Sequence, residues 1–339
     1  MEEIEFRDYG GVARVHINRP SALNSINLDM VSKIRSCIQG NRDKEIVMTG
    51  EGRAFCAGGD VVAVVSKNIP VIDYFRNEFV LDYEISCIPT PRIAILDGIT
   101  MGGGVGLSMA CSHRVLTNKT LWAMPETIIG FFPDVGASYF LNKLCCRELG
   151  LYLGLTGRHL TGVDAFFSGI SSIYIPEITE NIKNSILNLG QACLASYQIT
   201  PDSNNSQILR DLPLIQQFFD SNFTLENIFE RLASSNDPWC QKTLSTLNEM
   251  CPFSLKLTRE MFNRGQSLSY FEVLEMDLNL CKKVCQDEPY NFRHGITWRI
   301  IEKKKTRPQW QPSTLQEVPE AQIQNYFSDF PLKLILHKL

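Results

Sequence analysis

The sequence predicts an α/β protein in which helices pack on a sheet, followed by a helical region towards the C-terminus. Short apolar or alternating runs, which are typical of strands, recur between helical runs up to about residue 140. From Ala137 onwards the patterns are almost all helical. Strands and helices that alternate in this way form layers, because each element must bury its apolar face against another.

The first predicted strand and helix rest on alternating side chains and on a residue that can cap a helix. In residues 11–18 a wholly apolar set of side chains alternates with a partly polar set, which predicts a strand with one buried face. Asn27 can cap a helix over residues 28–38, because its side chain can accept a hydrogen bond from the first turn. Residues 45–49 form an apolar run that predicts a short buried strand, and residues 50–60 are predicted to be a glycine-bearing loop.

Prolines and polar stretches separate the later elements. A helix is predicted over residues 71–85, and Pro89 and Pro91 interrupt the chain after it. The polar stretch 198–206 (QITPDSNNS) is the best candidate for a domain boundary. The further predicted strands are 92–96, 113–117 and 121–123, and the further predicted helices include 103–111, 138–144, 147–155 and 162–167.

The composition excludes several classes of function. A chain of 339 residues with 44% hydrophobic and 21% charged residues can bury the core of one large or two modest domains. The net charge of −4 and the pI near 5.8 argue against nucleic acid as a partner. The one dense basic run, Lys303 to Lys305, is interpreted as a solvated helix end.

The cysteines and the chain ends point to an intracellular protein. The eleven cysteines contain no CxxC pair, so we expect reduced and mostly buried thiols and no metal site. No signal or transit peptide is visible in the acidic start, MEEIEF. The apolar stretch 93–111 is interrupted by Asp97 and rich in glycine, so we do not expect a membrane span or a membrane partner.

A run of three glycines, Gly102 to Gly104, lies between a predicted strand and a predicted helix. The glycines could simply let the helix pack closely on the sheet, or the helix N-terminus could hold a developing negative charge with exposed N–H groups. The run alone leaves both interpretations open. Because Leu107 occupies a glycine position of the GxGxxG pattern, the sequence argues against a dinucleotide site.

Ser108 raises the alternative of a Ser-His-Asp hydrolase, because Gly106 to Ala110 resembles a loosened nucleophile elbow. The elbow requires a strand, a sharp turn and the serine in immediate succession. Here the predicted strand ends at Leu96, far from Ser108, so we interpret Ser108 as a residue inside a helix. The histidines, His337 among them, do not cluster in the sequence, and none is favoured as a base.

Two carboxylates, Glu126 and Asp134, lie in an otherwise apolar stretch. A single acid there could cap a helix or pair with an arginine. Two acids eight positions apart among isoleucine and phenylalanine are better explained as a site, because burial raises carboxyl pKa values into a useful range. Glu78 is one charge on a largely apolar helix, and taken alone it is interpreted as a surface acid.

Five segments together resemble the crotonase (enoyl-CoA hydratase/isomerase) superfamily, and within it the 3-hydroxyisobutyryl-CoA hydrolase subfamily. The resemblance begins at NRPSALNSI (18–26) and is strongest in GRAFCAGGD (52–60), ITMGGGVGLS (99–108) and AMPETxxGxFPDVGxSYFL (123–141). It returns in divergent form over residues 291–310. The combination of these motifs is far more specific than any one of them.

The resemblance implies roles for individual residues. Gly59 and Gly103 would form an oxyanion hole with their backbone N–H groups. Glu126 matches the main catalytic glutamate, Asp134 matches the second acid of the hydrolase subfamily, and Glu78 matches a substrate-lining glutamate. The other substrate-binding residues that the resemblance implies are Ala22, Leu23, Ser25, Ala57 and Asp60.

The implied fold is a crotonase-type spiral of ββα repeats over residues 1–200, with a helical region over residues 201–339 that covers the site. Hydratases place a second glutamate where this chain has Gly106, so hydration by two facing glutamates is not available. Residues 145–147 and 291–301 depart from the subfamily pattern, which leaves the substrate open.

The implied reaction is hydrolysis of a short branched 3-hydroxyacyl-CoA thioester, above all 3-hydroxyisobutyryl-CoA in valine breakdown. No cofactor is expected, because CoA is part of the substrate, and homo-oligomerisation is left open. The cytoplasm, the peroxisome and the mitochondrial matrix all fit as locations. The alternatives are an enoyl-CoA or dienoyl-CoA isomerase of the same fold, and a non-catalytic CoA-binding protein.

Overall fold

A computed structural model of the chain describes residues 2–66 and 69–336; His337 lies outside the described residues. The protein is an α/β protein with two sheets and many helices, as predicted. The larger sheet has the strand order β1-β2-β3-β5-β7-β10, in which β1 is antiparallel to β2 and the other neighbours are parallel. Its strands are β1 (Ile4–Asp8), β2 (Val12–Ile17), β3 (Glu45–Gly50), β5 (Arg92–Leu96), β7 (His113–Leu116) and β10 (Ile173–Tyr174).

The smaller sheet has the order β4-β6-β8-β9, with β8 and β9 antiparallel and the other neighbours parallel. Its strands are β4 (Ala54–Cys56), β6 (Ile99–Met101), β8 (Leu121–Ala123) and β9 (Leu160–Thr161). We predicted β8 but placed β4 and β6 in loops. Both have three residues and lie among glycines, so no alternating pattern marks them.

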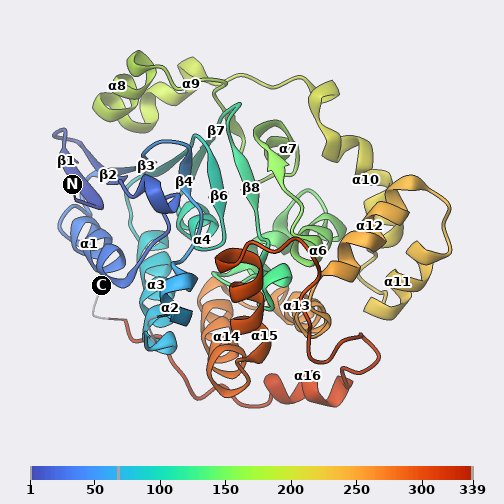
Figure 1. Cartoon of the computed structure of the whole chain (residues 1–339). Helices are drawn as coiled ribbons and strands as arrows, with labels where there is room; N and C mark the ends of the chain where they lie inside the picture. Colours follow the sequence, from blue (N-terminus) through green and yellow to red (C-terminus); the bar gives the residue numbers. More distant parts are fainter. Residues whose placement is uncertain (1, 67–68, 337–339) are drawn as a thin grey trace.

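The later helices lie along the right and the bottom of the view in Figure 1, where α14 packs on α3 and α10 packs on α6. The helices up to residue 200 are α1 (Leu28–Gln39), α2 (Val61–Ser66), α3 (Val71–Ser86), α4 (Gly103–Ala110), α5 (Ala137–Phe140), α6 (Arg147–Thr156), α7 (Gly162–Phe167), α8 (Glu180–Leu189) and α9 (Leu194–Tyr197). The later helices are α10 (Gln207–Phe218), α11 (Leu225–Ala233), α12 (Pro238–Glu249), α13 (Pro252–Gly265), α14 (Tyr270–Lys282), α15 (Tyr290–Ile296) and α16 (Glu320–Tyr326).

The predicted helix cap at Asn27 is confirmed, because its side chain accepts a hydrogen bond from the backbone N–H of Met30. The prediction of one buried face for β2 was wrong, since every residue of the strand is buried. Arg14 and His16 are accommodated there because both side chains contact the hydroxyl group of Thr49 on β3. Helices α8 and α9 cover this second face, where they complete a separate apolar cluster.

The helical C-terminal part is joined to the sheets through one continuous apolar core, which includes residues of α3 and α14. The stretch 198–206 contains only the short turn Ser203–Asn205, and the division of the chain near residue 200 stays a prediction. Among the described residues, no helix is both long and apolar enough to cross a membrane.

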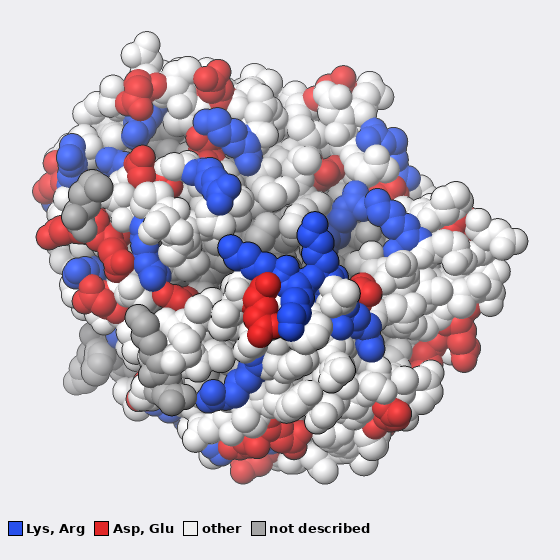
Figure 2. All heavy atoms as spheres, in the orientation of Figure 1, with Lys and Arg blue, Asp and Glu red and all other residues white. Residues whose placement is uncertain are grey.

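The predictions for the basic run and for the cysteines can be compared with the structure. Lys303 to Lys305 are exposed and follow the π-helical turn η7 (Thr297–Ile301), so the prediction of a solvated helix end is confirmed. Lys and Arg side chains gather near the middle of the face in Figure 2, where α15 and the segment after it lie in Figure 1. All eleven cysteines are unpaired, and most are buried.

Candidate active site

The two glycines predicted to form an oxyanion hole lie side by side. Gly59 follows β4, and Gly103 is the first residue of α4. Among the described residues, neither backbone N–H has a hydrogen-bond acceptor. A Cβ on Gly103 would lie 3.2 Å from the nitrogen of Gly59 and would overlap Oε1 of Glu78. Two free N–H groups therefore meet at a point where no side chain could fit.

The structure supports the packing interpretation of the glycine run, and its role in holding a negative charge stays a prediction. Gly104 packs so closely on β4 that a Cβ would overlap the carbonyl of Cys56, which is the packing explanation. Gly102 has a left-handed φ of 49°, and a Cβ there would lie 3.0 Å from Oε1 of Glu126. The middle glycine, Gly103, is the one whose Cβ would lie beside the nitrogen of Gly59.

Glu126 begins the short 3-10 helix η2 (Glu126–Ile129), which Gly130 ends with a left-handed φ of 72°. The side chain is 6% exposed, and its Oε2 atom has no hydrogen-bond partner among the described residues. Burial raises the pKa of Glu126 well above its ordinary value, and the charge of Asp134 raises it further. The carboxyl group is thus available to react rather than committed to a structural contact.

Asp134 and Glu78 join Glu126 in one buried acid cluster. Burial raises the pKa of Asp134 to about 7. Burial also raises the pKa of Glu78, on α3, well above its ordinary value, with a further contribution from the charge of Asp134. The interpretation of Glu78 as a surface acid was therefore wrong. Acids that share a site in this way can pass protons at neutral pH.

Two further buried acids, Asp82 and Asp277, were not predicted as site residues. Asp82 lies one turn after Glu78 on α3, and neither of its carboxyl oxygens has a partner among the described residues. Asp277 lies on α14, and its Oδ2 accepts a hydrogen bond of 2.9 Å from the N–H of Gly136. Burial, and then nearby acids, raises the pKa of both groups well above the ordinary value. The spacing of Asp82 to Glu78 on an apolar helix is a local signal for Asp82, whereas no local pattern connects Asp277 to the site.

The space beside α4 explains why a second glutamate is absent at position 106. A Cβ on Gly106 would lie 2.6 Å from Oδ2 of Asp82 and 2.7 Å from Cβ of Val135. These contacts leave no room for a glutamate side chain. The acid that faces Glu126 is instead Asp134, the residue before Val135.

The segment predicted to follow the substrate, Ala22 to Ser25, lies against the loop that carries Gly59. Ala57 donates a backbone hydrogen bond of 3.0 Å to Leu23, and Ile26 donates one of 2.9 Å to Gly58. The structure therefore brings together the residues at 22–25 and 57–60 that the resemblance named. Their contact with a substrate stays a prediction.

Asp60 is already engaged in structural contacts. Its carboxyl group forms a salt bridge of 2.8 Å with Arg19 and accepts a hydrogen bond of 2.9 Å from the N–H of Ala63 in α2. These contacts hold the Gly59 loop against the segment before α1. A role of Asp60 towards substrate is therefore expected to be indirect.

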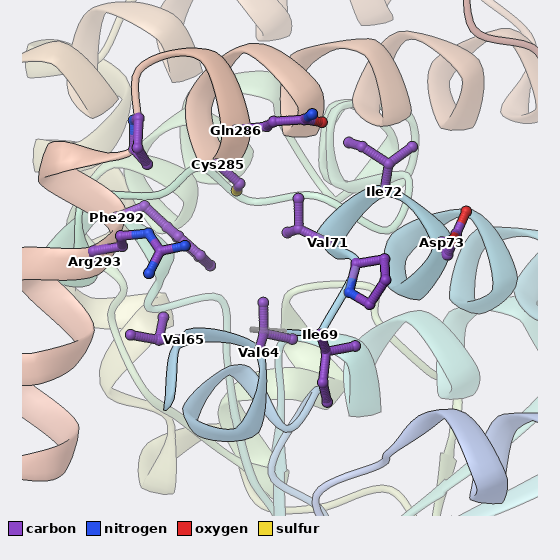
Figure 3. Close-up of a pocket in the computed structure, with 12 residues that line it drawn as sticks. Val64, Val65, Ile69, Val71, Ile72, Asp73, Cys285, Gln286, Phe292 and Arg293 are labelled. Carbon is purple, nitrogen blue, oxygen red and sulfur yellow. The ribbon is translucent and has the colours of Figure 1, made fainter. Parts of the chain in front are cut away.

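A cavity of about 410 Å³ opens between α2, the start of α3 and α15. Figure 3 shows Val64, Val71 and Phe292 around the opening, with Arg293 next to Phe292. The ring of Phe292 lies 5.3 Å from that of Phe131, which stacks at 5.4 Å on Phe75 of α3. These aromatic side chains connect the cavity to the two elements that carry Glu126 and Glu78.

Helix α15 covers η2 at a close crossing. A Cβ on Gly130 would overlap the backbone carbonyl of Asn291, and one on Gly295 would overlap that of Ile129. The C-terminal part thus closes over the backbone that carries Glu126, at the place where the sequence resemblance returns.

The serine hydrolase alternative finds no support in this geometry. Ser108 is buried inside α4, and its hydroxyl donates a hydrogen bond of 2.8 Å to the carbonyl of Val105 in the same helix. The interpretation of Ser108 as a helix-interior residue is confirmed.

Comparison with known proteins agrees with this geometry. The enoyl-CoA hydratase/isomerase family matches residues 12–327. The chain is 35% identical to 3-hydroxyisobutyryl-CoA hydrolase, mitochondrial, from Gallus gallus, with 96% of this chain and 88% of that protein covered. It is 34% identical to the protein of the same name from Homo sapiens, with the same two shares covered.

Solved structures share the whole fold. A carnitinyl-CoA dehydratase from Mycobacterium thermoresistibile superposes with a TM-score of 0.89 at 29% identity, covering 99% of both chains. An enoyl-CoA hydratase from Rhodobacter sphaeroides gives a TM-score of 0.83 at 27% identity, covering 96% of this chain and 97% of that one.

Proposed function

The chain belongs to the enoyl-CoA hydratase/isomerase family, and from that premise we propose that it hydrolyses a short branched 3-hydroxyacyl-CoA thioester, with 3-hydroxyisobutyryl-CoA as the preferred substrate. The observation that carries the proposal is the pair of N–H groups at Gly59 and Gly103, which have no acceptor in residues 2–66 and 69–336 and lie near the buried acid Glu126. The names of the relatives from Gallus gallus and Homo sapiens support the choice of substrate.

The thioester carbonyl oxygen is held between the two glycine N–H groups, where negative charge develops during attack. Each such donor contributes about 3 kcal/mol to the transition state. This contribution matters here, because a carboxylate (pKa about 4.3) is less basic than a thiolate (pKa about 8.5), so an acyl-carboxyl anhydride lies uphill of a thioester. The buried position of the acids strengthens these interactions.

In the covalent route, the Glu126 carboxylate attacks the carbonyl carbon and the carbon–sulfur bond breaks. The products of this step are a mixed anhydride on Glu126 and the CoA thiolate. Water then opens the anhydride, which releases the hydroxy acid and regenerates the Glu126 carboxylate. In the alternative route, Glu126 removes a proton from a water molecule that attacks the thioester directly.

Asp134 supplies the second acid. Its pKa of about 7 lets it exchange a proton near neutral pH. The charge of Asp134 raises the pKa of Glu126, so a proton on Asp134 favours the reactive carboxylate form of Glu126. In this state it either gives its proton to the departing sulfur or binds the 3-hydroxyl group of the substrate. The space at Gly106, filled by Asp82 and Val135, favours hydrolysis over hydration by two glutamates.

The cavity beside α15 suits the entry of the acyl-CoA. Its apolar walls and the single cation Arg293 match a ligand with a thin chain and phosphates. The Lys and Arg side chains on the face of Figure 2 attract the same phosphates. The reaction is proposed to need no metal or redox cofactor, and to serve the breakdown of valine. By extension from relatives whose names include mitochondrial, the mitochondrial matrix is the proposed location among the intracellular compartments.

The experiment is a thiol-release assay on a panel of CoA esters: 3-hydroxyisobutyryl, isobutyryl, 3-hydroxybutyryl and crotonyl. The proposal requires free CoA from the hydroxylated esters, with the highest kcat/KM for 3-hydroxyisobutyryl-CoA. A shift of a double bond without release of thiol would identify an isomerase. Binding of the esters without any turnover would identify a CoA-binding protein.

A further inference from the structure

The turn after Asp134 has a strained backbone. Val135 and Gly136 both adopt the left-handed region, with φ values of 50° and 83°. A β-branched residue such as valine strongly disfavours this region, and such a residue persists there only where its surroundings hold it. The backbone N–H of Ala137 donates a hydrogen bond of 2.9 Å to the carbonyl of Asp134, which closes the turn.

Contacts from two other helices hold this turn. The side chain of Val135 fits against α4 only because position 106 is glycine, as the 2.7 Å distance to a Cβ there shows. On the other side, the carboxyl group of Asp277 accepts the N–H of Gly136 at 2.9 Å, from 141 residues further along the chain. A Cβ on Gly136 would overlap the ring of Tyr270, which lies two turns before Asp277 on α14.

The buried carboxyl group of Asp277 lowers the stability of the folded protein. Its side chain is fully buried, and its second oxygen, Oδ1, has no partner among the described residues. A buried polar atom without a partner destabilises a protein, and an apolar residue would fill a helix interior at lower cost. Within the described part of the chain, the one hydrogen bond of this carboxyl group is the one from Gly136, in the turn after Asp134.

We propose that Asp277 is a positioning residue, which holds the strained turn at Val135 and Gly136 through the Gly136 N–H and thereby aims the carboxyl group of Asp134 at the substrate. This inference rests on the proposed role of Asp134 towards the 3-hydroxyl group. Burial and the charge of Asp134 favour a protonated, neutral Asp277. A neutral acid at this position accepts the N–H with its carbonyl oxygen, as an asparagine side chain would.

The test compares three variants, Asp277→Asn, Asp277→Ala and Asp277→Leu, on 3-hydroxyisobutyryl-CoA and isobutyryl-CoA. Asparagine keeps the acceptor, so both kcat/KM values should stay within about threefold of wild type. Alanine and leucine remove the acceptor, so the kcat/KM ratio of the hydroxylated to the plain ester should fall about tenfold. Leucine also avoids a cavity, so it serves where the alanine variant does not fold.

Asn279→Ala is the matched control. Asn279 is a buried polar residue on the same helix, and its side chain exchanges hydrogen bonds of 2.9 Å and 2.8 Å with the backbone of Leu332. Loss of the Asn279 side chain should lower the Tm and leave unchanged the kcat/KM ratio of the hydroxylated to the plain ester.

Equal losses on both esters in Asp277→Ala and Asp277→Leu, as in Asn279→Ala, would overturn the proposal and leave Asp277 a purely structural residue. Asp134→Asn is measured in parallel. If that variant keeps the wild-type ratio, the role of Asp134 towards the hydroxyl group fails, and the inference for Asp277 fails with it. The two failures are thus distinguished.

Discussion

The nitrogen of Gly59 lies 3.2 Å from the place that a Cβ would take on Gly103, and a Cβ there would also overlap Oε1 of Glu78. A side chain at position 103 would therefore crowd both the Gly59 nitrogen and the acid cluster. The proposed oxyanion hole and the buried acid Glu78 are thus direct neighbours.

Gly103→Val should abolish thioester hydrolysis, because the side chain would overlap Glu78 and crowd the two N–H groups that are proposed to hold the carbonyl oxygen. We expect a loss of kcat of about hundredfold or more. Gly11→Val is the control, since nothing lies within 4 Å of a Cβ at that glycine. A Gly103→Val protein with normal Tm and normal activity would place the oxyanion site elsewhere.

Asp134→Asn should reduce kcat/KM for 3-hydroxyisobutyryl-CoA more than for isobutyryl-CoA. A buried hydroxyl group that loses its hydrogen-bond partner costs about 1–3 kcal/mol, so we expect a difference of about tenfold between the esters. Equal losses would mean that Asp134 acts only in proton transfer to the leaving sulfur or through its charge.

The stability of the protein should depend on pH through Asp134. In the unfolded chain this acid ionises near its ordinary pKa of 3.8, whereas burial raises the pKa in the folded protein to about 7. Between these values the folded protein binds more protons, so the free energy of unfolding falls as the pH rises and levels off above about 7.

Asp134→Asn removes this dependence, so its gain in Tm over wild type should be larger at pH 8 than at pH 5. Glu78, Asp82, Glu126 and Asp277 face the same site with raised pKa values, so the variant is compared with wild type at each pH. The same difference in Tm at both pH values would contradict the raised pKa of Asp134.

The sequence alone predicted the parts of the fold that have strong local patterns. The helix after Asn27 and the strands β5 and β8 were readable because caps, prolines and apolar runs mark their ends. The strands β4 and β6 were missed because they lie among glycines and no proline marks their ends, whereas Pro125 follows β8, which is equally short.

Some residues of the site have a local signal in the sequence, and others do not. Glu126 and Asp134 stand out locally as acids in an apolar stretch, and Asp82 could have been found from its spacing to Glu78 on an apolar helix. Asp277 could not, because its partner Gly136 is 141 residues away and only the packing of α14 brings them together. The pairing of two glycine N–H groups also needed either the family resemblance or the structure.

The covalent route can be separated from direct attack by water. Over many turnovers in ¹⁸O-water, water that opens the anhydride at the glutamyl carbonyl places label in Glu126, and hydroxylamine should trap the anhydride as a hydroxamate. We expect substrate-dependent label in the peptide that contains Glu126, or hydroxamate that forms at a rate matching thiol release. If turnover continues with neither product, Glu126 acts as a general base.

Glu126 is proposed to carry out thioester hydrolysis, and the decisive measurement is the rate of CoA release from 3-hydroxyisobutyryl-CoA by wild type and by Glu126→Gln. Glutamine has nearly the same shape but is a poor nucleophile and base, so the fold and the Tm should be preserved. We predict rapid release by wild type and a kcat lower by about hundredfold or more in the variant. A folded Glu126→Gln protein that keeps more than about a tenth of the wild-type kcat would contradict the account.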